Sequence, residues 1–121
     1  MSYYSEIKQQ GNIKTRLNYQ KILAKWKKFK KEQSREKQEY LDQYTFILIR
    51  EDDNFKFYEI QCVDTYNKHY ADFELAQFIS QIIADEIFFL IFLGEDNHVW
   101  GYQIAPKKVK WMSKHFIINI M

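Results

Sequence analysis

This chain of 121 residues contains very little cysteine, glycine or proline. The single cysteine, Cys62, excludes an internal disulfide and any zinc site built from several cysteines, and it suits a reducing compartment. Three glycines and one proline argue against a sandwich rich in tight turns, and favour long elements joined by polar connections. Because the glycines are isolated, the chain also lacks a glycine-rich phosphate loop and a Gly-x-Ser-x-Gly elbow.

Long apolar runs are missing as well. No run approaches the roughly 20 residues that a membrane-spanning helix needs, and the first residues lack the basic start and apolar stretch of a secretory signal. These absences predict a soluble intracellular protein of the cytoplasm or nucleus. The length allows one domain, and a hydrophobic share of 46% is enough to build its core.

The charges are segregated along the chain although the net charge is only +2. Residues 14–37 carry ten basic side chains against two acidic ones, residues 39–96 carry three against thirteen, and residues 97–121 carry four lysines and no acid. This distribution predicts an acidic body with basic material at both ends.

The apolar run from Ile87 to Leu93 is the centre of the predicted fold. Its seven large side chains are typical of a strand that is buried on both faces. Before it, Asp72 is placed to cap a helix with one apolar face, and after it residues 99–104 return as an antiparallel neighbour. The apolar face of that helix is formed by Leu75, Ala76, Ile79, Ile82 and Ile83.

The remaining segments complete an α+β prediction. Residues 1–11 are predicted to be a flexible or partner-ordered end, and a long basic helix is expected from about residue 12, with a polar continuation over residues 30–38. Strands at residues 45–50 and 55–63 form a hairpin around an acidic turn, and residues 116–120 are expected to add a short C-terminal strand. The prediction is a single domain with a basic arm and helix at 1–38 and an α+β body at 39–121, its strands ordered strand, strand, helix, strand, strand.

Lysines flank aromatic residues in two segments, residues 25–30 and 107–111. Such segments can neutralise phosphates while the aromatic rings stack on bases. Alternatively, the lysines of the helix form a face that is only solvated, or they contact an acidic surface of another protein. The candidate nucleic-acid-binding residues are Lys21, Lys25, Lys27, Lys28, Lys30, Lys31, Lys107, Lys108 and Lys110.

Four aromatic residues are candidates for binding a protein partner: Trp26, Phe29, Phe57 and Trp111. Trp26 and Phe29 have helical spacing, so they pack either on the body or on another subunit. Phe57 lies on a sheet face for which only the N-terminal helix is left as a cover. If that helix does not cover it, the aromatic face is available to another chain.

The histidines do not predict a metal site, because His69, His98 and His115 are far apart and none has a partner at helical ligand spacing. Cys62 has no nearby histidine or basic residue to lower its pKa, and strand alternation points it inward. It is therefore predicted to be a core residue, and no resident cofactor is expected.

The one remaining candidate for a catalytic site consists of carboxylates. Glu59 and Gln61 share a strand face, with Asp52 and Asp53 in the preceding turn, and oxygen ligands of this kind suit Mg²⁺. The helix, apolar strand and hairpin that follow Glu59 resemble the restriction-endonuclease-like superfamily, including archaeal Holliday-junction resolvases and the small non-catalytic subunit of tRNA-splicing endonuclease. Gln61 stands where that superfamily has a lysine, so the resemblance implies a non-catalytic member.

Three functions follow from these patterns. The first is a small non-catalytic structural subunit or adaptor of a nucleic-acid-processing complex, with a protein partner and a basic arm on RNA or DNA. The second is a divergent nuclease that uses Mg²⁺ at Glu59 with Asp52 or Asp53. The third is a small viral or plasmid inhibitor that occupies a partner's surface with its acidic body.

Overall fold

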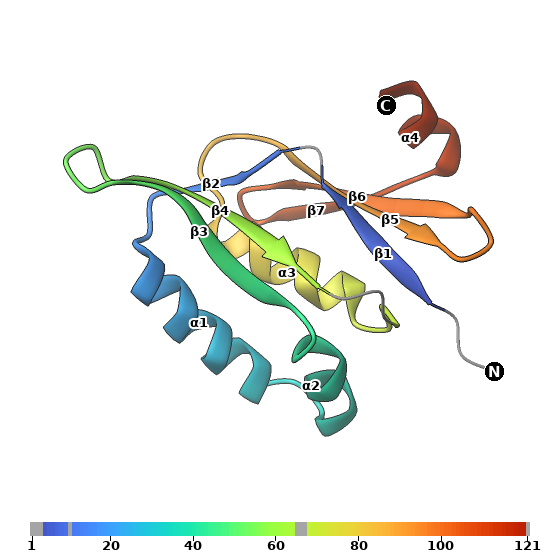
Figure 1. Ribbon diagram of the computed structural model, residues 1–121, viewed down its shortest axis with the longest axis horizontal. Helices are drawn as coiled ribbons and strands as arrows, with labels where there is room; N and C mark the ends of the chain where they lie inside the picture. The colour runs from blue at the N-terminus through green and yellow to red at the C-terminus, as the bar shows by residue number, and fades with distance from the viewer. Residues whose placement is uncertain (1–3, 10, 65–67, 121) are drawn as a thin grey trace.

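Two antiparallel sheets with helices packed around them make up the computed structural model, which describes residues 4–9, 11–64 and 68–120 (Figure 1). The α+β class is confirmed. The elements in chain order are β1 (Ser5–Gln9), β2 (Ile13–Thr15), α1 (Tyr19–Lys31), α2 (Arg35–Leu41), β3 (Thr45–Asp52), β4 (Phe57–Val63), α3 (Asp72–Ile82), β5 (Phe88–Gly94), β6 (Val99–Ala105), β7 (Lys108–Met112) and α4 (Lys114–Ile120).

The strands are divided between a four-stranded sheet, β1-β5-β6-β7, and a three-stranded sheet, β2-β4-β3. The predicted order of strand, strand, helix, strand, strand was incomplete, because β1 and β2 precede it and the two hairpins lie in different sheets. The β5 run is buried along most of its length, as its composition predicted. It therefore needs a hydrogen-bonding neighbour on both edges, and β6 supplies only one of them.

The other neighbour of β5 comes from the N-terminal end. Strand β1 pairs antiparallel with β5, placing Ile7 opposite Phe92 and Ser5 opposite Gly94. Strand β2 pairs with β4, and Thr15 forms a bridge with Ile83. The prediction of a flexible end was therefore wrong for the described residues 4–9, since their backbone completes the ladder around the most buried strand.

The basic N-terminal helix is shorter than predicted and is followed by a second helix. Asn18 caps α1 by accepting a hydrogen bond from the Lys21 amide (2.9 Å). The helix ends at Lys31, and Ser34 caps α2 by accepting from the Lys37 amide (3.3 Å). A serine oxygen that satisfies free amides favours a new helix start, so the continuous helix over residues 30–38 was wrong.

The hairpin of β3 and β4 is confirmed, and Tyr58, Ile60 and Cys62 face the core as the alternation predicted. The apolar face of α3 is also confirmed. Asp72, however, is not the cap of α3. The N-cap position is Ala71, and the Asp72 carboxylate instead reaches across to the four-stranded sheet.

The C-terminal segment forms a helix where a short strand was expected. Pro106 and Lys107 make a two-residue turn from β6 into β7, and residues 114–120 then form α4. Ile117 of this helix packs on Ile91 and Met112 of the four-stranded sheet. The strand prediction failed because a short apolar run is ambiguous between the two structures until its packing surface is known.

Helix α3 is the centre of the packing. It contacts β6, β7 and α1, and its Phe78 is fully buried. The Phe78 ring lies 4.8 Å from Trp26 of α1 and 5.5 Å from Phe46 of β3, measured between ring centroids. The described part of the chain contains no helix with the length and apolar character needed to cross a membrane.

Gly101 in β6 provides a test of the sheet packing. A Cβ added there would lie 2.4 Å from the Leu90 carbonyl oxygen, which belongs to the backbone of β5 and cannot rotate away. We expect Gly101→Ala to lower the free energy of unfolding by about 1–3 kcal/mol, measured by urea denaturation. Gly11→Ala is the matched control, since a Cβ there meets nothing within 4 Å. Equal denaturation midpoints for the two variants would contradict this packing.

Candidate nucleic-acid interface

The lysines of α1 are divided between two faces of the helix. At about 100° per residue, Lys21, Lys25 and Lys28 fall along one stripe, next to the buried stripe of Ile22 and Trp26. All three lysines are exposed. The helix therefore presents a basic edge immediately beside the side that packs into the core.

This basic edge borders α3. Lys25 and Lys28 line an open hollow of about 220 Å³ together with Glu32 of α1's C-terminal end and Gln81 of α3. The half-buried Phe29 forms part of its wall. Two lysines and one carboxylate thus surround a surface whose other polar groups are neutral.

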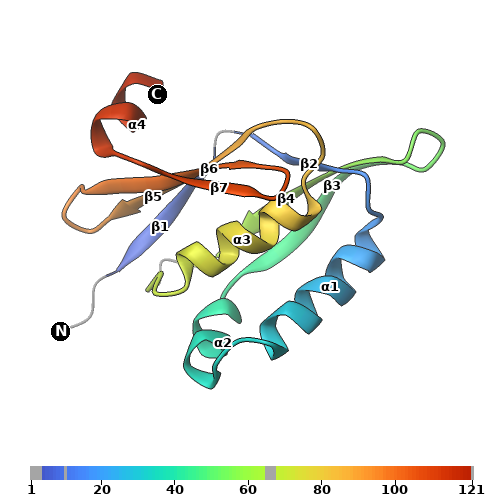
Figure 2. The same ribbon diagram turned by 180° about the vertical axis from the view of Figure 1, so that it is seen from behind.

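A second hollow, of about 510 Å³, shares the wall residue Gln81 with the first. Its walls are Gln77 and Phe73 of α3, and Lys107 and Val109 of the β6–β7 hairpin. Figure 2 shows α3 between α1 on one side and β7 on the other. We call the combined surface, from Lys25 and Lys28 across Gln81 and Gln77 to Lys107 and Phe73, the basic groove.

Lys107 is held at the groove by its own backbone. Its amide donates to the Ser80 carbonyl of α3 (2.9 Å), which ties the β6–β7 turn to the helix. The residue has a φ of 61°, a left-handed conformation that a lysine adopts at a cost of about 1 kcal/mol. The turn thus fixes the backbone of Lys107 beside α3.

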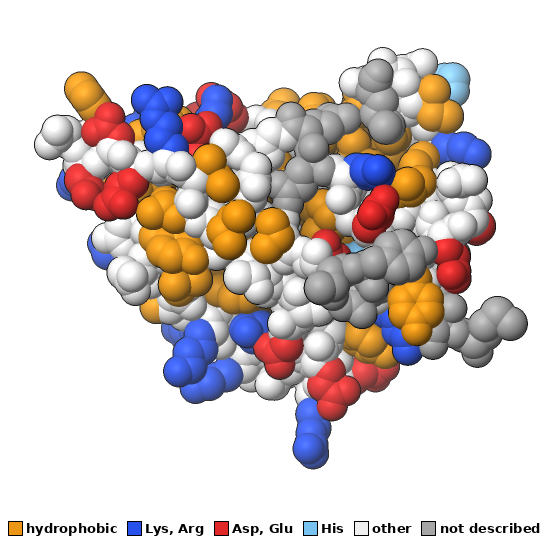
Figure 3. Space-filling model, in the orientation of Figure 1, with side chains coloured by type: hydrophobic (Ala, Val, Ile, Leu, Met, Phe, Trp, Pro, Cys, Tyr) orange, Lys and Arg blue, Asp and Glu red, His pale blue; other side chains and the backbone are white. Residues whose placement is uncertain are grey.

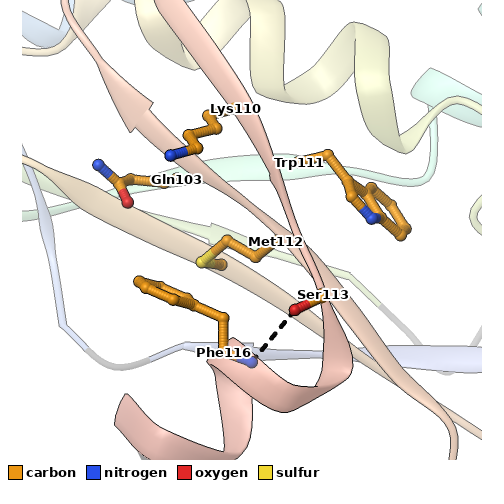
Figure 4. A pocket seen from close by; sticks show the side chains of 6 residues that line it. All are labelled: Gln103, Lys110, Trp111, Met112, Ser113 and Phe116. Atoms are coloured by element: carbon orange, nitrogen blue, oxygen red, sulfur yellow. Dashed lines mark hydrogen bonds between the residues drawn. The ribbon is translucent and has the colours of Figure 1, made fainter.

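Three aromatic rings lie at the Phe73 end of the groove. Phe73 of α3 is 45% exposed and Trp111 of β7 is 57% exposed. Between them lies the buried Tyr102, whose ring centroid is 5.9 Å from Phe73 and 5.5 Å from Trp111. Figure 4 shows that Trp111 projects from β7 to the side opposite Lys110 and Met112.

Asp72 fixes this aromatic cluster. Its Oδ2 atom accepts from the Trp100 indole nitrogen (2.8 Å) and from the Tyr102 hydroxyl (3.2 Å). Burial and the neighbouring Asp72 charge raise the pKa of Tyr102 well above its ordinary value. Tyr102 therefore stays a neutral hydrogen-bond donor, and its ring is held in one orientation between Phe73 and Trp111.

The groove is electrostatically positive. Its walls carry Lys25, Lys28 and Lys107 against the single carboxylate of Glu32. Among the residues that the structure describes, none of these three lysines forms an ion pair. Their charges are thus available to an anion that lies along the groove.

The other predicted lysines of the helix lie elsewhere. Lys30 pairs with Asp42 (2.9 Å) and lies 5.5 Å from the Trp26 ring, so its charge is used within the fold. Lys27 and Lys31 are exposed on α1 and do not line the hollow beside Gln81.

The lysines of β7 also lie outside the groove. Lys108 and Lys110 alternate with Val109 and therefore lie on the opposite face of the sheet. There Lys110 lines a separate hollow of about 240 Å³ beside α4 (Figure 4). The remaining walls of that hollow are Gln103, Met112, Ser113 and Phe116, and Trp111 borders it although its ring projects to the opposite face (Figure 4).

The four aromatic residues predicted to bind a partner have different environments. Trp26 is only 5% exposed, and Phe29 is half-buried against Phe78. Phe57 is half-buried below the guanidinium of Arg16, 5.9 Å from its ring centroid. Of the four, Trp111 alone presents most of its surface to solvent.

The outside of the three-stranded sheet, which is the face that carries Phe57, also presents apolar residues that were not among the predicted partner-binding residues. Ile47, Ile49 and Val63 are exposed there, and Figure 3 shows hydrophobic side chains gathered over β3 and β4. The alternation of β3 with its buried Phe46 was the available signal, because it placed Ile47 outward.

Glu59 and Gln61 of β4 each have a partner from a neighbouring strand or turn. The Glu59 carboxylate lies 3.9 Å from Arg50, and the Gln61 amide donates to the Asn12 side chain (2.8 Å). Both side chains therefore take part in contacts across the outside of the three-stranded sheet.

The carboxylates of Asp52 and Asp53 accept hydrogen bonds from residues of their own hairpin. Asp52 accepts from the Phe55 amide (3.2 Å), and Asp53 accepts from the Tyr58 hydroxyl (2.7 Å), which raises the pKa of Tyr58. A hydrogen bond with Asp53 also raises the pKa of Glu51. Within residues 4–9, 11–64 and 68–120, no three histidine, cysteine or acidic side chains converge as metal ligands.

A buried chain of Ser5, His69 and Asp64 was not visible in the sequence. The Ser5 hydroxyl shares a hydrogen bond with Nδ1 of His69, and Nε2 of His69 bonds the Asp64 carboxylate. The imidazole stacks on Tyr44 and makes a tilted contact with Phe92, with centroid distances of 5.5 and 4.9 Å. Ser5 is 1% exposed, so these three residue types, although familiar from hydrolases, form a structural link between β1 and the loop after β4.

Cys62 is fully buried, as predicted. Burial raises the pKa of its thiol well above the ordinary value, and the nearby Asp64 charge adds to the effect. The thiolate needed for nucleophilic or redox chemistry is therefore disfavoured.

Comparisons of this chain with protein-family models, with curated proteins and with solved structures found no match. The resemblance to the restriction-endonuclease-like superfamily thus stays a prediction.

Proposed function

We propose that this protein binds nucleic acid along the basic groove and acts as a non-catalytic adaptor. The observation that carries the proposal is the meeting of two lysine segments that are about 80 residues apart in sequence. The fold places Lys25 and Lys28 of α1 and Lys107 of the β6–β7 turn around one surface. Each segment was a candidate by itself, and together they provide a track for successive phosphates.

The groove suits a polyanion with flat polar bases better than an acidic protein surface. Its floor carries the amides of Gln77 and Gln81, which both donate and accept hydrogen bonds. Its end carries the exposed rings of Phe73 and Trp111. Aromatic faces next to lysines match the combination of base and phosphate within each nucleotide.

The adaptor part of the proposal is supported by the apolar strip of Ile47, Ile49 and Val63 on the opposite sheet. This strip lies on β3 and β4 and shares no residue with the groove. A protein partner on that sheet would leave the groove open. The nuclease and inhibitor functions remain predictions, since the contacts of Glu59 and Asp52 described above do not favour either.

A charge-reversal experiment tests the groove. We expect the triple replacement of Lys25, Lys28 and Lys107 by glutamate to weaken binding of a labelled oligonucleotide about 100-fold, because three phosphate contacts become repulsive. Fluorescence anisotropy at several salt concentrations measures this effect. The slope of log K against log salt should also become shallower.

The matched control reverses Lys27, Lys31 and Lys108, which are exposed but line neither hollow of the groove. It changes the net charge by the same amount, so we expect it to weaken binding less than about threefold. If both triple variants lose affinity equally, net charge and not the groove is responsible. If neither variant changes the affinity, the groove is not the binding site.

A further inference from the structure

We propose that the basic groove selects single-stranded nucleic acid, with bases stacked on Phe73 and Trp111 and phosphates on Lys25, Lys28 and Lys107. This inference rests on the proposed function and specifies its ligand. Charge alone does not distinguish a duplex from a single strand, because both carry phosphates. The two differ in their base faces, which are free for stacking only in the single strand.

The two exposed rings are prepared for stacking. Phe73 and Trp111 come from different elements, α3 and β7, and both pack against Tyr102. Tyr102 is in turn held by its hydrogen bond to Asp72. Since each ring contacts Tyr102 and has about half of its surface exposed, a base can stack on a side chain that is already held in place.

The charges around the groove also separate a site for bases from a site for phosphates. Its aromatic end adjoins the Asp72 carboxylate, whereas its other end carries Lys25 and Lys28. Carboxylates repel phosphates but tolerate neutral bases. A strand that turns its bases toward Phe73 and its phosphates toward the lysines matches this distribution.

A duplex does not match the distribution. Its base faces are stacked on one another, so Phe73 and Trp111 could reach them only by inserting between base pairs and unstacking them. A second phosphate backbone would also have to lie toward the carboxylate end. The groove geometry therefore favours a single strand over a duplex with the same number of phosphates.

Three probes separate stacking from charge: a 12-mer of deoxythymidine, a 12-base-pair duplex, and a 12-mer of abasic phosphodiester units. We expect the unmodified protein to bind the thymidine strand at least about tenfold more tightly than either of the others. The double variant Phe73→Ala/Trp111→Ala should lose about tenfold or more toward the thymidine strand. Its affinity for the abasic strand should stay within about twofold, because the lysines are unchanged.

Two further variants serve as controls. Phe73→Tyr/Trp111→Phe keeps both rings and should retain at least half of the affinity for thymidine. Phe55→Ala removes a ring that is 75% exposed on the β3–β4 turn, far from the groove in the fold, and should have no effect (Figure 1). Circular dichroism of each variant shows whether it is folded.

The outcomes distinguish this inference from the proposed function. If the lysine triple variant loses binding but the alanine double variant binds the thymidine strand normally, stacking is overturned and the basic groove stands. Equal affinity of the unmodified protein for strand and duplex overturns the selectivity in the same way. If none of the three probes binds, both the inference and the proposed function are wrong.

Discussion

Replacing Trp26 by alanine is expected to lower the free energy of unfolding by about 3–5 kcal/mol. The indole is 5% exposed and joins three elements of the core. Its ring lies 4.8 Å from Phe78 of α3 and 5.1 Å from Phe46 of β3, measured between centroids. Removing it leaves a cavity between α1, α3 and the three-stranded sheet, where no single element can move to fill the space.

Urea denaturation followed by circular dichroism measures this loss. Lys27→Ala is the control, because Lys27 is the next residue of the same helix and is exposed, so its replacement should change stability by less than about 0.5 kcal/mol. If Trp26→Ala were as stable as this control, the indole would be a surface contact, as in the partner-binding prediction. The expected result instead means that any loss of ligand binding by Trp26→Ala reflects unfolding.

The second large effect is expected at His69. Replacing it by phenylalanine keeps a ring between Tyr44 and Phe92 but removes both nitrogens, which leaves the Asp64 carboxylate and the Ser5 hydroxyl without this partner. An uncompensated buried carboxylate costs about 3–5 kcal/mol. We expect a loss of stability of that size, and weaker attachment of β1 to the rest of the fold.

A double-mutant cycle separates this effect from simple loss of packing. Adding Asp64→Leu to His69→Phe removes the carboxylate as well, so the double variant should be more stable than His69→Phe alone. Hydrogen exchange of the β1 amides reports the attachment of the strand directly. Additive losses in the cycle, or unchanged protection of residues 5–9, would show that the chain of Ser5, His69 and Asp64 does not hold β1.

Local sequence patterns predicted the elements whose burial follows a simple period. The alternation of Tyr58, Ile60 and Cys62 predicted which face of β4 is buried, and the run around Leu90 predicted a strand with little exposed surface. The apolar stripe of α3 predicted in the same way which face of that helix is buried. In each case the period of the backbone, 2 for a strand and 3.6 for a helix, decides which side chains share a face, so neighbouring residues are sufficient.

The same local reasoning failed where a segment depends on a distant partner. Residues 5–9 have no strong period of their own, and they form β1 because β5, more than 80 residues later, needs a second neighbour. Residues 116–120 form a helix because Ile117 can pack on Met112 only once β7 is in place. Short segments adopt the structure that buries their apolar groups, and the surface available to them is tertiary.

The sequence by itself determined the α+β class, the two lysine and aromatic segments, and the buried position of Cys62, since composition and periodicity are local properties. Only the tertiary structure decided which of those lysines lie around one surface. Lys107 joins Lys25 and Lys28 because its backbone amide bonds Ser80 of α3, while Lys30 is removed from the set by Asp42. Such selections depend on backbone and side-chain contacts between different elements of the fold, and no local pattern contains them.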